Sequence, residues 1–272
     1  MSSTNRQERK AAAFRDLHAS GAFVIPNPWD AGSARMLEAL GFEALATTSA
    51  GFAFTLGRMD GGVTLEEVVE HVAAVDRATE LPVSVDLENG FGPDPADAAR
   101  AITRVAEAGA VGGSIEDWDP DGHLYPLDHA AERIAAAAGA ARALSFPLML
   151  TARAENHIRG NPNLDDTIAR LRAFEDAGAD VLYAPGLRSG DEIRAVCEVV
   201  SRPLNVLALP GLSFAEIVDA GARRISVGAG LAWVAMRAAA SAATAIRDGQ
   251  ELSVLDVRLP LELWFGNETR PS

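Results

Sequence analysis

One unit repeats along this chain: an alanine-rich helical pattern, then a glycine, then a short apolar stretch that ends in small or polar residues. The four clearest copies are LEALGFEALATTS (37–49), AEAGAVGGSIED (106–117), EDAGADVLYAPG (175–186) and VDAGARRISVG (218–228). The glycine of each copy suits the end of a helix, where the backbone often turns left-handed. These glycines are Gly41, Gly109, Gly178 and Gly221. The repeat therefore predicts helices and strands in alternation.

Weaker copies complete the pattern. They add strand candidates at 22–30, 81–90, 146–156 and 202–211. Together with the four clear copies, the chain has eight strand candidates. Helical patterns are expected at 31–40, 64–78, 94–107, 129–143, 165–177, 190–200, 213–220 and 230–247. Eight alternating units predict a parallel sheet closed into a (β/α)8 TIM barrel, an α/β fold, and 272 residues with 48% hydrophobic content suffice for it. An open doubly wound sheet is the alternative, although no G-x-G-x-x-G or Walker loop supports nucleotide binding.

The domain prediction follows from these ranges. Residues 1–17 form an N-terminal arm, residues 18–248 form the barrel, and residues 249–272 form an extra C-terminal helical segment.

Composition narrows the class of protein. A formal charge of −14 argues against a nucleic-acid partner or an anionic membrane surface. Residues 228–246 are apolar, but Arg237 in their middle favours a packed helix over a membrane span. The charged N-terminus has no apolar core of the kind found in secretory signals, so we expect a soluble cytoplasmic protein.

Two residue counts exclude mechanisms. Lys10 is the only lysine and lies in the N-terminal arm, which argues against Schiff-base chemistry in a pocket. Cys197 is the only cysteine, so neither an intramolecular disulfide nor a cysteine zinc cluster can form. Cys197 is predicted to be a small core residue.

Barrel enzymes carry their sites where the strands end. The residues expected at those ends are Asn27, Trp29 and Asp30; Thr47, Thr48 and Ser49; Asp86 and Glu88; Glu116 and Asp117; Arg153 and Glu155; and Asn205. In SVDLENGFG (84–92), strand alternation would point Asp86 and Glu88 to one face. A solvated strand face is the plain alternative, but Glu116 on the next strand and Arg153 on the one after favour a functional acidic cluster.

Three carboxylates without histidine or cysteine form a hard oxygen site, which selects Mg²⁺ or Mn²⁺ over zinc. Asp86, Glu88 and Glu116 are the candidate ligands, partly through water. Arg153 offers a planar fork for a substrate carboxylate, or else forms an internal ion pair with Glu155 or Glu116. A divalent cation beside a carbonyl would stabilise an enolate.

The stretches TTSAGFAFTLGRMDG, SVDLENGFG, GSIEDW and LTARAEN resemble those of the isocitrate lyase/phosphoenolpyruvate mutase superfamily over roughly residues 18–248. The resemblance, strongest to methylisocitrate lyases, implies a (β/α)8 barrel that binds Mg²⁺ and stabilises the enolate of pyruvate or a related oxo acid. It assigns the metal to Asp86, Glu88 and Glu116, with Glu88 replacing an aspartate common among the lyases. It further implies a catalytic Asp60, substrate binding by Arg153, a carboxylate site at Ser49, Ala50 and Gly51, and a weaker match at Asn205.

One loop departs from the family pattern. The lyases carry Lys-Lys/Arg-Cys-Gly-His after SIED, and its cysteine serves as acid/base, whereas this chain has WDPDGHLYPLDH (118–129). The lysine or asparagine of the mutase and phosphonate-hydrolase branches is absent too. His123 is the remaining candidate acid/base, with a solvated loop histidine as the alternative. The other histidines are expected at the surface, and RISVGAG (224–230) could cradle a phosphate or serve tight packing.

The predicted function is a Mg²⁺-dependent carbon–carbon bond lyase or decarboxylase acting on a small 2-oxo or 2-hydroxy carboxylic acid. Phosphonate (P–C bond) mutase or hydrolase chemistry, or a barrel that binds an oxo acid without turnover, are the alternatives. The apolar tail LSVLDVRLPLELWFGNETRPS (252–272) would be costly in water. It could fold back on its own barrel, but the resemblance favours a homo-oligomer, a dimer or a tetramer formed by pairing of dimers.

Overall fold

The computed structural model describes residues 3–249 and 252–266. Its main sheet has eight parallel strands in the order β1-β10-β9-β8-β7-β4-β3-β2. The strands are β1 (Phe23–Ile25), β2 (Leu45–Ala46), β3 (Val83–Asp86), β4 (Gly112–Glu116), β7 (Met149–Arg153), β8 (Val181–Tyr183), β9 (Leu204–Leu207) and β10 (Arg224–Ser226). A separate hairpin pairs β5 (Trp118–Asp119) with β6 (His123–Leu124).

The two ends of this strand order meet. The backbone N–H of Ala46 in β2 donates to the carbonyl of Pro26, directly after β1, at 3.1 Å. The side chain of Asn27 donates to the carbonyl of Thr47 at 3.1 Å. The sheet is thereby closed, which confirms the (β/α)8 barrel and excludes the open doubly wound alternative.

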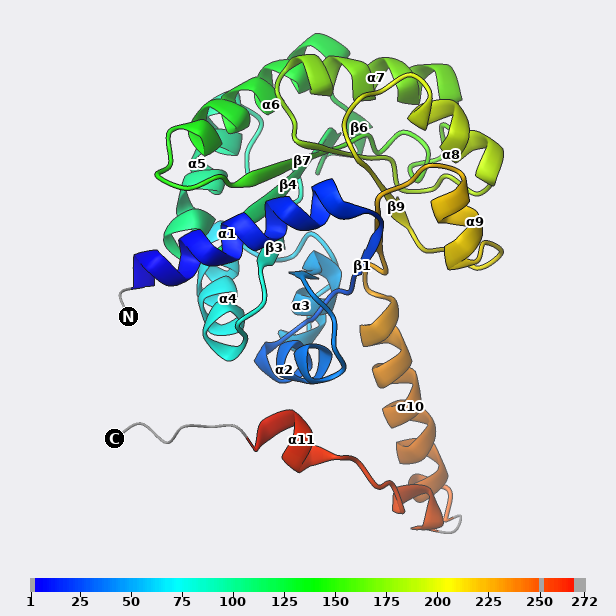
Figure 1. Cartoon of the computed structure of the whole chain (residues 1–272). Helices are drawn as coiled ribbons and strands as arrows, with labels where there is room; N and C mark the ends of the chain where they lie inside the picture. Colours follow the sequence, from blue (N-terminus) through cyan, green and yellow to red (C-terminus); the bar gives the residue numbers. More distant parts are fainter. Residues whose placement is uncertain (1–2, 250–251, 267–272) are drawn as a thin grey trace.

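Helices surround the barrel (Figure 1). They are α1 (Ser3–Ser20), α2 (Ala31–Ala39), α3 (Ser49–Thr55), α4 (Leu65–Ala78), α5 (Pro95–Glu107), α6 (Leu127–Arg142), α7 (Leu164–Asp176), α8 (Gly190–Cys197), α9 (Phe214–Asp219), α10 (Gly230–Arg247) and α11 (Leu261–Phe265), with a 3₁₀ turn η1 (Leu252–Leu255). All eight predicted helices are present within a few residues of their expected bounds. The glycines that follow four of the repeated helices have φ between +88° and +110°, as the repeat predicts: Gly41, Gly109, Gly178 and Gly221.

Helix α1 closes the end of the barrel at which the strands begin, and Figure 1 shows it crossing in front of them. Phe14 of α1 is fully buried against the first residues of β7 and β8, Met149 and Val181. Lys10 is also buried, and its ammonium pairs with Asp76 at 2.6 Å. The lone lysine therefore lies far from the strand ends, which leaves no lysine for imine chemistry there. The expected arm, residues 1–17, forms most of this helix within the described part.

The expectation of surface histidines is wrong at two positions. His18 is 8% exposed and His157 is 9% exposed. The His18 ring packs edge-on against Phe14 and Phe23, and its Nδ1 lies 2.8 Å from the Phe14 carbonyl. Burial, followed by the nearby Arg224 guanidinium, lowers the pKa of His18 to about 4.

We predict from His18 that acid destabilises the fold. Its folded-state pKa lies below the unfolded value of about 6.5, so the unfolded chain binds more protons as the pH falls from 6.5 to 4. Stability is therefore lost over that window, by up to about 2–3 kcal/mol for this ring. Urea unfolding at pH 7.5 and 5 measures the loss. His18→Gln should show a smaller loss than wild type, whereas the exposed His123→Gln should match wild type; an identical loss in all three would contradict the assignment.

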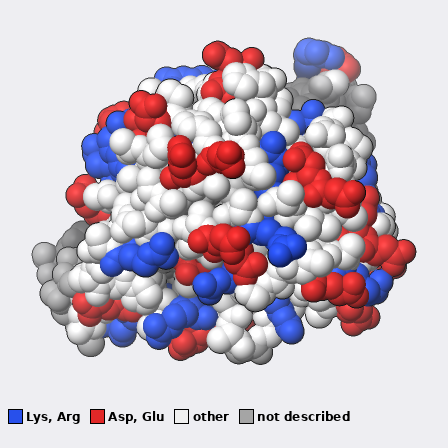
Figure 2. All heavy atoms as spheres, turned by 90° about the horizontal axis from the view of Figure 1, so that it is seen from above, with Lys and Arg blue, Asp and Glu red and all other residues white. Residues whose placement is uncertain are grey.

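The face that α6 and α7 cover, seen from the top of Figure 1, carries acidic and basic side chains interspersed (Figure 2). The excess of acidic residues in the chain is thus not gathered into one patch on this side. Among the described residues, no helix is long and apolar enough to cross a membrane.

Helix α10 runs away from the barrel, and the chain then returns so that α11 lies beneath α2 (Figure 1). Ala232 is the one buried residue among those that the structure describes in α10, while Trp233 and Val234 are 60% and 61% exposed. In the tail, Arg35 of α2 donates to the Phe265 carbonyl at 3.1 Å. The predicted tail, 249–272, is thus described only in part, since residues 250, 251 and 267–272 lie outside the described ranges.

Candidate active site

Two adjoining hollows lie where the strands end, and both are lined by Ser49, Asp60 and Arg153. The inner hollow descends into the barrel past Asn205, Ser226 and Arg224. The outer hollow opens beside the hairpin and is further lined by Gly61, Glu88, Asn89, Glu116, Trp118, Pro120 and Arg159. Acids and arginines from β3, β4 and β7 therefore meet in one place, as their positions at strand ends predict.

Asp86 is the last residue of β3, and four hydrogen bonds fix it, one of them from the Glu88 backbone N–H to its Oδ1 at 3.4 Å. Its Oδ2 accepts the backbone N–H of Ser49 at 3.1 Å, and its Oδ1 accepts Arg153 Nη1 at 2.8 Å. The Asp86 backbone N–H donates to the hydroxyl of Thr47 at 3.0 Å. The carboxylate is thus held in a defined orientation in the inner hollow, by Ser49 and Arg153, which line both hollows.

Glu88 reaches the same site by a different route from the one that strand alternation suggests. The strand ends at Asp86, and Glu88 has a φ of +49°, a left-handed conformation that is rare outside glycine. Its Oε1 is buried and has no hydrogen-bond partner. Burial, with the charges of Asp86 and Asp60, raises the pKa of Glu88 to about 8. A cation at this carboxylate would satisfy both the bare oxygen and the surplus negative charge.

The loop that carries Glu88 is held from below by Arg133 of α6, which is 1% exposed. Its guanidinium donates to the backbone carbonyls of Asn89, Gly92 and Asp94. It also lies over the ring of Tyr125, 4.6 Å from the centroid. This anchoring explains how an unfavourable backbone conformation at Glu88 is maintained.

Glu116 ends β4 and lies between two arginines. Its Oε2 lies 3.0 Å from Arg153 Nη2, and its Oε1 lies 3.5 Å from Arg159 Nη2. Despite these partners, burial and the neighbouring Glu155 raise its pKa well above the usual range.

Arg153 is the centre of the ion-pair network. Besides Asp86 and Glu116, it contacts Glu155 Oε1 through Nη2 at 2.9 Å and Nε at 3.1 Å, and its guanidinium lies 5.2 Å from the centroid of Tyr183. These contacts can use four of the five N–H donors of a guanidinium. The internal ion pair considered for Arg153 is therefore present, and one Nη1 donor is left for a ligand.

The carboxylate site implied at Ser49, Ala50 and Gly51 lies in the first turn of α3. The Ser49 hydroxyl donates to Asp60 Oδ1 at 3.0 Å, and the Gly51 N–H donates to Thr48 Oγ1 at 3.3 Å. Ser49 and Ala50 line the inner hollow together with Asp60. Ser49 and Ala50 thus face the acids across the inner hollow, whereas Gly51 is buried behind them and lines neither hollow.

The two remaining candidates lie at different depths. Asn205 is buried in the floor of the inner hollow, where it donates to Ser226 and accepts from Arg224. His123 is exposed in β6 and is not among the residues that line either hollow. The structure thus brings Asn205 into the site and leaves His123 outside it.

Sequence reasoning missed Arg159 and Tyr183, which both contribute to the site. Arg159 lies six residues beyond the end of its strand, where barrel topology gives no reason to expect a side chain to turn back. Its guanidinium lies over the Trp118 ring, 4.7 Å from the centroid, and its Nε lies 3.2 Å from Glu155 Oε2. Tyr183 ends β8, so its place at a strand end was the signal available for it.

The donor set fits a hard divalent cation bound partly through water. Five carboxylates (Asp60, Asp86, Glu88, Glu116 and Glu155) face three guanidiniums (Arg153, Arg159 and the deeper Arg224), an excess of two negative charges when all the acids are ionised. Within residues 3–249 and 252–266, no three of the usual ligand side chains are grouped closely enough to hold an ion directly. Mg²⁺ commonly binds one or two carboxylates and keeps several waters. It can therefore occupy a site that has surplus negative charge but no three ligand side chains close together.

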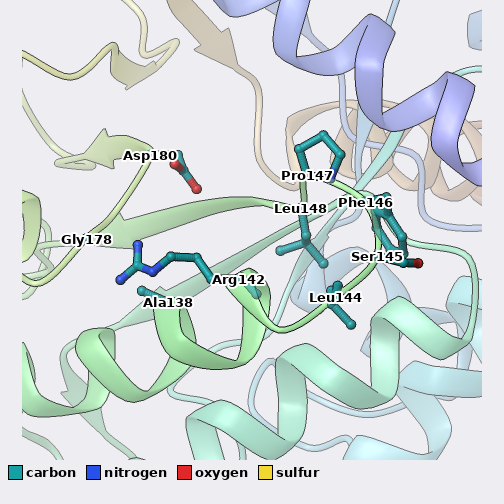
Figure 3. Close-up of a pocket in the computed structure, with 10 residues that line it drawn as sticks. Ala138, Arg142, Leu144, Ser145, Phe146, Pro147, Leu148, Gly178 and Asp180 are labelled. Carbon is teal, nitrogen blue, oxygen red and sulfur yellow. The ribbon is translucent and has the colours of Figure 1, made fainter.

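Another hollow, at the opposite end of the barrel, lacks this chemistry. It lies between the end of α6 and the starts of β7 and β8, and Figure 3 shows Arg142 and Asp180 at its edge. The Asp180 carboxylate there accepts the backbone N–H of Leu150 at 2.9 Å. Its lining includes one acid and one base, so it has no counterpart to the acidic cluster at the strand ends.

Comparisons with known proteins agree with this geometry. The sequence profile of the phosphoenolpyruvate phosphomutase family matches residues 14–247. A crystal structure from Burkholderia cenocepacia J2315, assigned as a lyase or mutase, is 51% identical, has a TM-score of 0.92, and covers 96% of this chain and 98% of its own. The 2-methylisocitrate lyase of Halalkalibacterium halodurans is 33% identical over 73% of this chain and 67% of its own.

A solved 2,3-dimethylmalate lyase is 27% identical, with a TM-score of 0.83, over 94% of this chain and 93% of its own. Three observations indicate the same family. They are the barrel fold, the acids at its strand ends and the profile match over most of the chain. This chain belongs to the phosphoenolpyruvate mutase/isocitrate lyase superfamily and is an enzyme of its lyase and mutase type.

Proposed function

We propose that this enzyme is a Mg²⁺-dependent lyase or decarboxylase that cleaves a carbon–carbon bond in a small 2-oxo or 2-hydroxy carboxylic acid. The observation that carries the proposal is the buried, unpaired Oε1 of Glu88 beside Asp86 and Glu116. Relatives named for 2-methylisocitrate and 2,3-dimethylmalate support a substrate of this kind.

Asp86, Glu88 and Glu116 would hold the cation, with Mn²⁺ as a substitute for Mg²⁺. When bound, the cation supplies a fixed positive charge that stabilises the enolate left by cleavage. Asp86 is oriented for this role by the Ser49 N–H, and the Glu88 loop is held in place by Arg133.

The substrate carboxylate would bind to Arg153 through its remaining donor and to the Ser49–Gly51 turn, with Asn205 below. Cleavage of a 2-hydroxy acid needs one group to accept the hydroxyl proton and another to protonate the enolate carbon. We assign proton transfer within the hollow to Asp60. His123 could act as the acid only if the β5–β6 hairpin folded over the outer hollow, which Trp118 and Pro120 of that segment already border.

A turnover screen tests the proposed function. Purified enzyme would be incubated with a panel of 2-oxo and 2-hydroxy acids, with either Mg²⁺ or EDTA, and the products followed by ¹³C NMR. We expect carbon–carbon cleavage of at least one acid, stopped by EDTA and restored by Mg²⁺. A phosphorus-containing product from phosphonopyruvate would instead support P–C bond chemistry, and tight binding without turnover of any acid would support a binding protein.

We further propose that the enzyme is a homo-oligomer, a tetramer, with α10 and the tail in the contact. The support is a run of large apolar side chains that are at least 51% exposed, too many to leave in water. They are Trp233, Val234, Met236, Leu252, Leu255, Val257, Leu259, Leu261 and Leu263. The cytoplasmic location expected from the sequence stays a prediction.

Light scattering on the full-length chain and on a chain ending at Gln250 tests the contact. We expect an oligomer for the full-length protein and a smaller mass after truncation, because the truncation removes six of the nine exposed apolar residues. A monomeric full-length protein at micromolar concentration would refute the oligomer. Equal oligomer masses for the two chains would place the contact outside the tail.

A further inference from the structure

Two arginines line the outer hollow at different depths and are joined by the same two carboxylates. Glu116 contacts Arg153 through Oε2 and Arg159 through Oε1, at 3.0 and 3.5 Å. Glu155 contacts Arg153 through Oε1 and Arg159 through Oε2, at 2.9 and 3.2 Å. The Arg153 side chain is 14% exposed and that of Arg159 is 36% exposed. The two guanidiniums therefore have a fixed order, with Arg153 inside and Arg159 at the rim.

Arg159 is held at the rim by more than its ion pairs. Its guanidinium lies over the Trp118 ring, and both residues line the outer hollow. Stacking on an aromatic face restricts the guanidinium plane while leaving its edge available. The ion pairs of Arg159 run through Nε and Nη2, so within the described part of the chain its Nη1 donates no hydrogen bond. Donors at the rim can therefore bind a group that enters from solvent.

The charge of the hollow makes such donors necessary for an anionic ligand. Acids outnumber arginines there, so each negative group of a substrate is repelled unless a cation lies next to it. The bound metal and Arg153 would serve the reacting end of the molecule. Arg159 is the remaining cation among the lining residues of the outer hollow, and it lies on the solvent side of that end.

We propose, building on the proposed function, that Arg159 binds a second carboxylate at the far end of the substrate. The enzyme therefore selects dicarboxylic over monocarboxylic oxo or hydroxy acids, and Arg159 is its specificity-determining residue. The order of the two arginines sets the orientation, with the oxo end inside and the second carboxylate at the rim.

Binding of a matched ligand pair tests this without requiring turnover. 2-Oxoglutarate and 2-oxopentanoate have the same five-carbon skeleton and differ only in the second carboxylate. Their affinities for Mg²⁺-loaded enzyme would be measured by calorimetry for wild type, Arg159→Gln and Arg159→Lys. Arg194→Gln is the matched control, because Arg194 forms an exposed ion pair with Asp191 on α8, outside both hollows. Thermal unfolding of each variant checks that it folds.

We expect wild type to bind 2-oxoglutarate roughly 10- to 100-fold more tightly than 2-oxopentanoate, the range for a hydrogen bond to a charged group. Arg159→Gln should remove that preference by weakening the dicarboxylate alone, Arg159→Lys should retain part of it, and Arg194→Gln should match wild type. Equal affinities in wild type, or an equal loss for both ligands in Arg159→Gln, would overturn this inference alone. Binding of neither ligand by wild type would overturn the proposed function as well. A stronger Arg159-dependent preference for phosphonopyruvate would overturn the carboxylate assignment in favour of a phosphonate.

Discussion

Asp86→Ala should abolish metal-dependent turnover, by on the order of 10³-fold or more, while leaving the barrel folded. Asp86 lines the inner hollow and is held by two residues that line both hollows, since one of its oxygens accepts the Ser49 N–H and the other accepts Arg153. Its loss removes one of the three proposed metal ligands and also frees Arg153 to pair more tightly with Glu116. Steady-state kinetics at saturating Mg²⁺ would measure the effect.

The control for this substitution is Asp191→Ala. Asp191 pairs with Arg194 on the surface of α8 and does not line either hollow, so its variant should retain wild-type kinetics. Circular dichroism and thermal unfolding of both variants show whether a loss of catalytic activity results from unfolding. Unchanged activity of Asp86→Ala in a metal-replete assay would refute the assignment of Asp86.

Arg153→Lys should lower kcat/KM by roughly 10²-fold, with most of the change in KM. Lysine keeps the charge but is a point donor, and it cannot replace a planar fork that contacts three carboxylates and still offers a donor to substrate. A group that serves only as an ion-pair partner behaves differently. Its replacement would lower the melting temperature and leave the kinetics of the folded enzyme unchanged. Wild-type kinetics for Arg153→Lys would therefore reduce Arg153 to a structural role.

Much of the fold could be predicted because its information is local and repeated. Each helix of the repeat carries its own apolar periodicity and ends at a glycine that adopts the left-handed conformation, as at Gly109. Strand ends then meet by topology alone, which places Asp86, Glu116 and Arg153 together. By contrast, α1 has few apolar residues, and its packing depends on single side chains such as Phe14 that meet distant strand starts.

The site itself was predictable only where a residue lies at a strand end. Glu88 was predicted to share a face with Asp86 by alternation, but it reaches the hollow through a left-handed backbone that Arg133, 45 positions along the chain, holds in place. Arg159 turns back toward the site because Trp118, on a hairpin between two strands, gives it a surface to stack on. Such contacts join segments that no local pattern relates, so the sequence alone does not indicate them.

We infer that the acids at the strand ends lie close together because they bind a divalent cation. A crystal of the enzyme soaked with Mn²⁺ and oxalate, a stable mimic of the small-acid enolate, tests this most directly through the anomalous signal of the metal. We predict a single strong peak among the acids where the two hollows adjoin, bonded directly to Asp86 and to oxalate and within reach of Glu88 and Glu116 through water. No anomalous peak among these acids after the soak, with Arg153 still bridging Asp86 and Glu116, would contradict this inference.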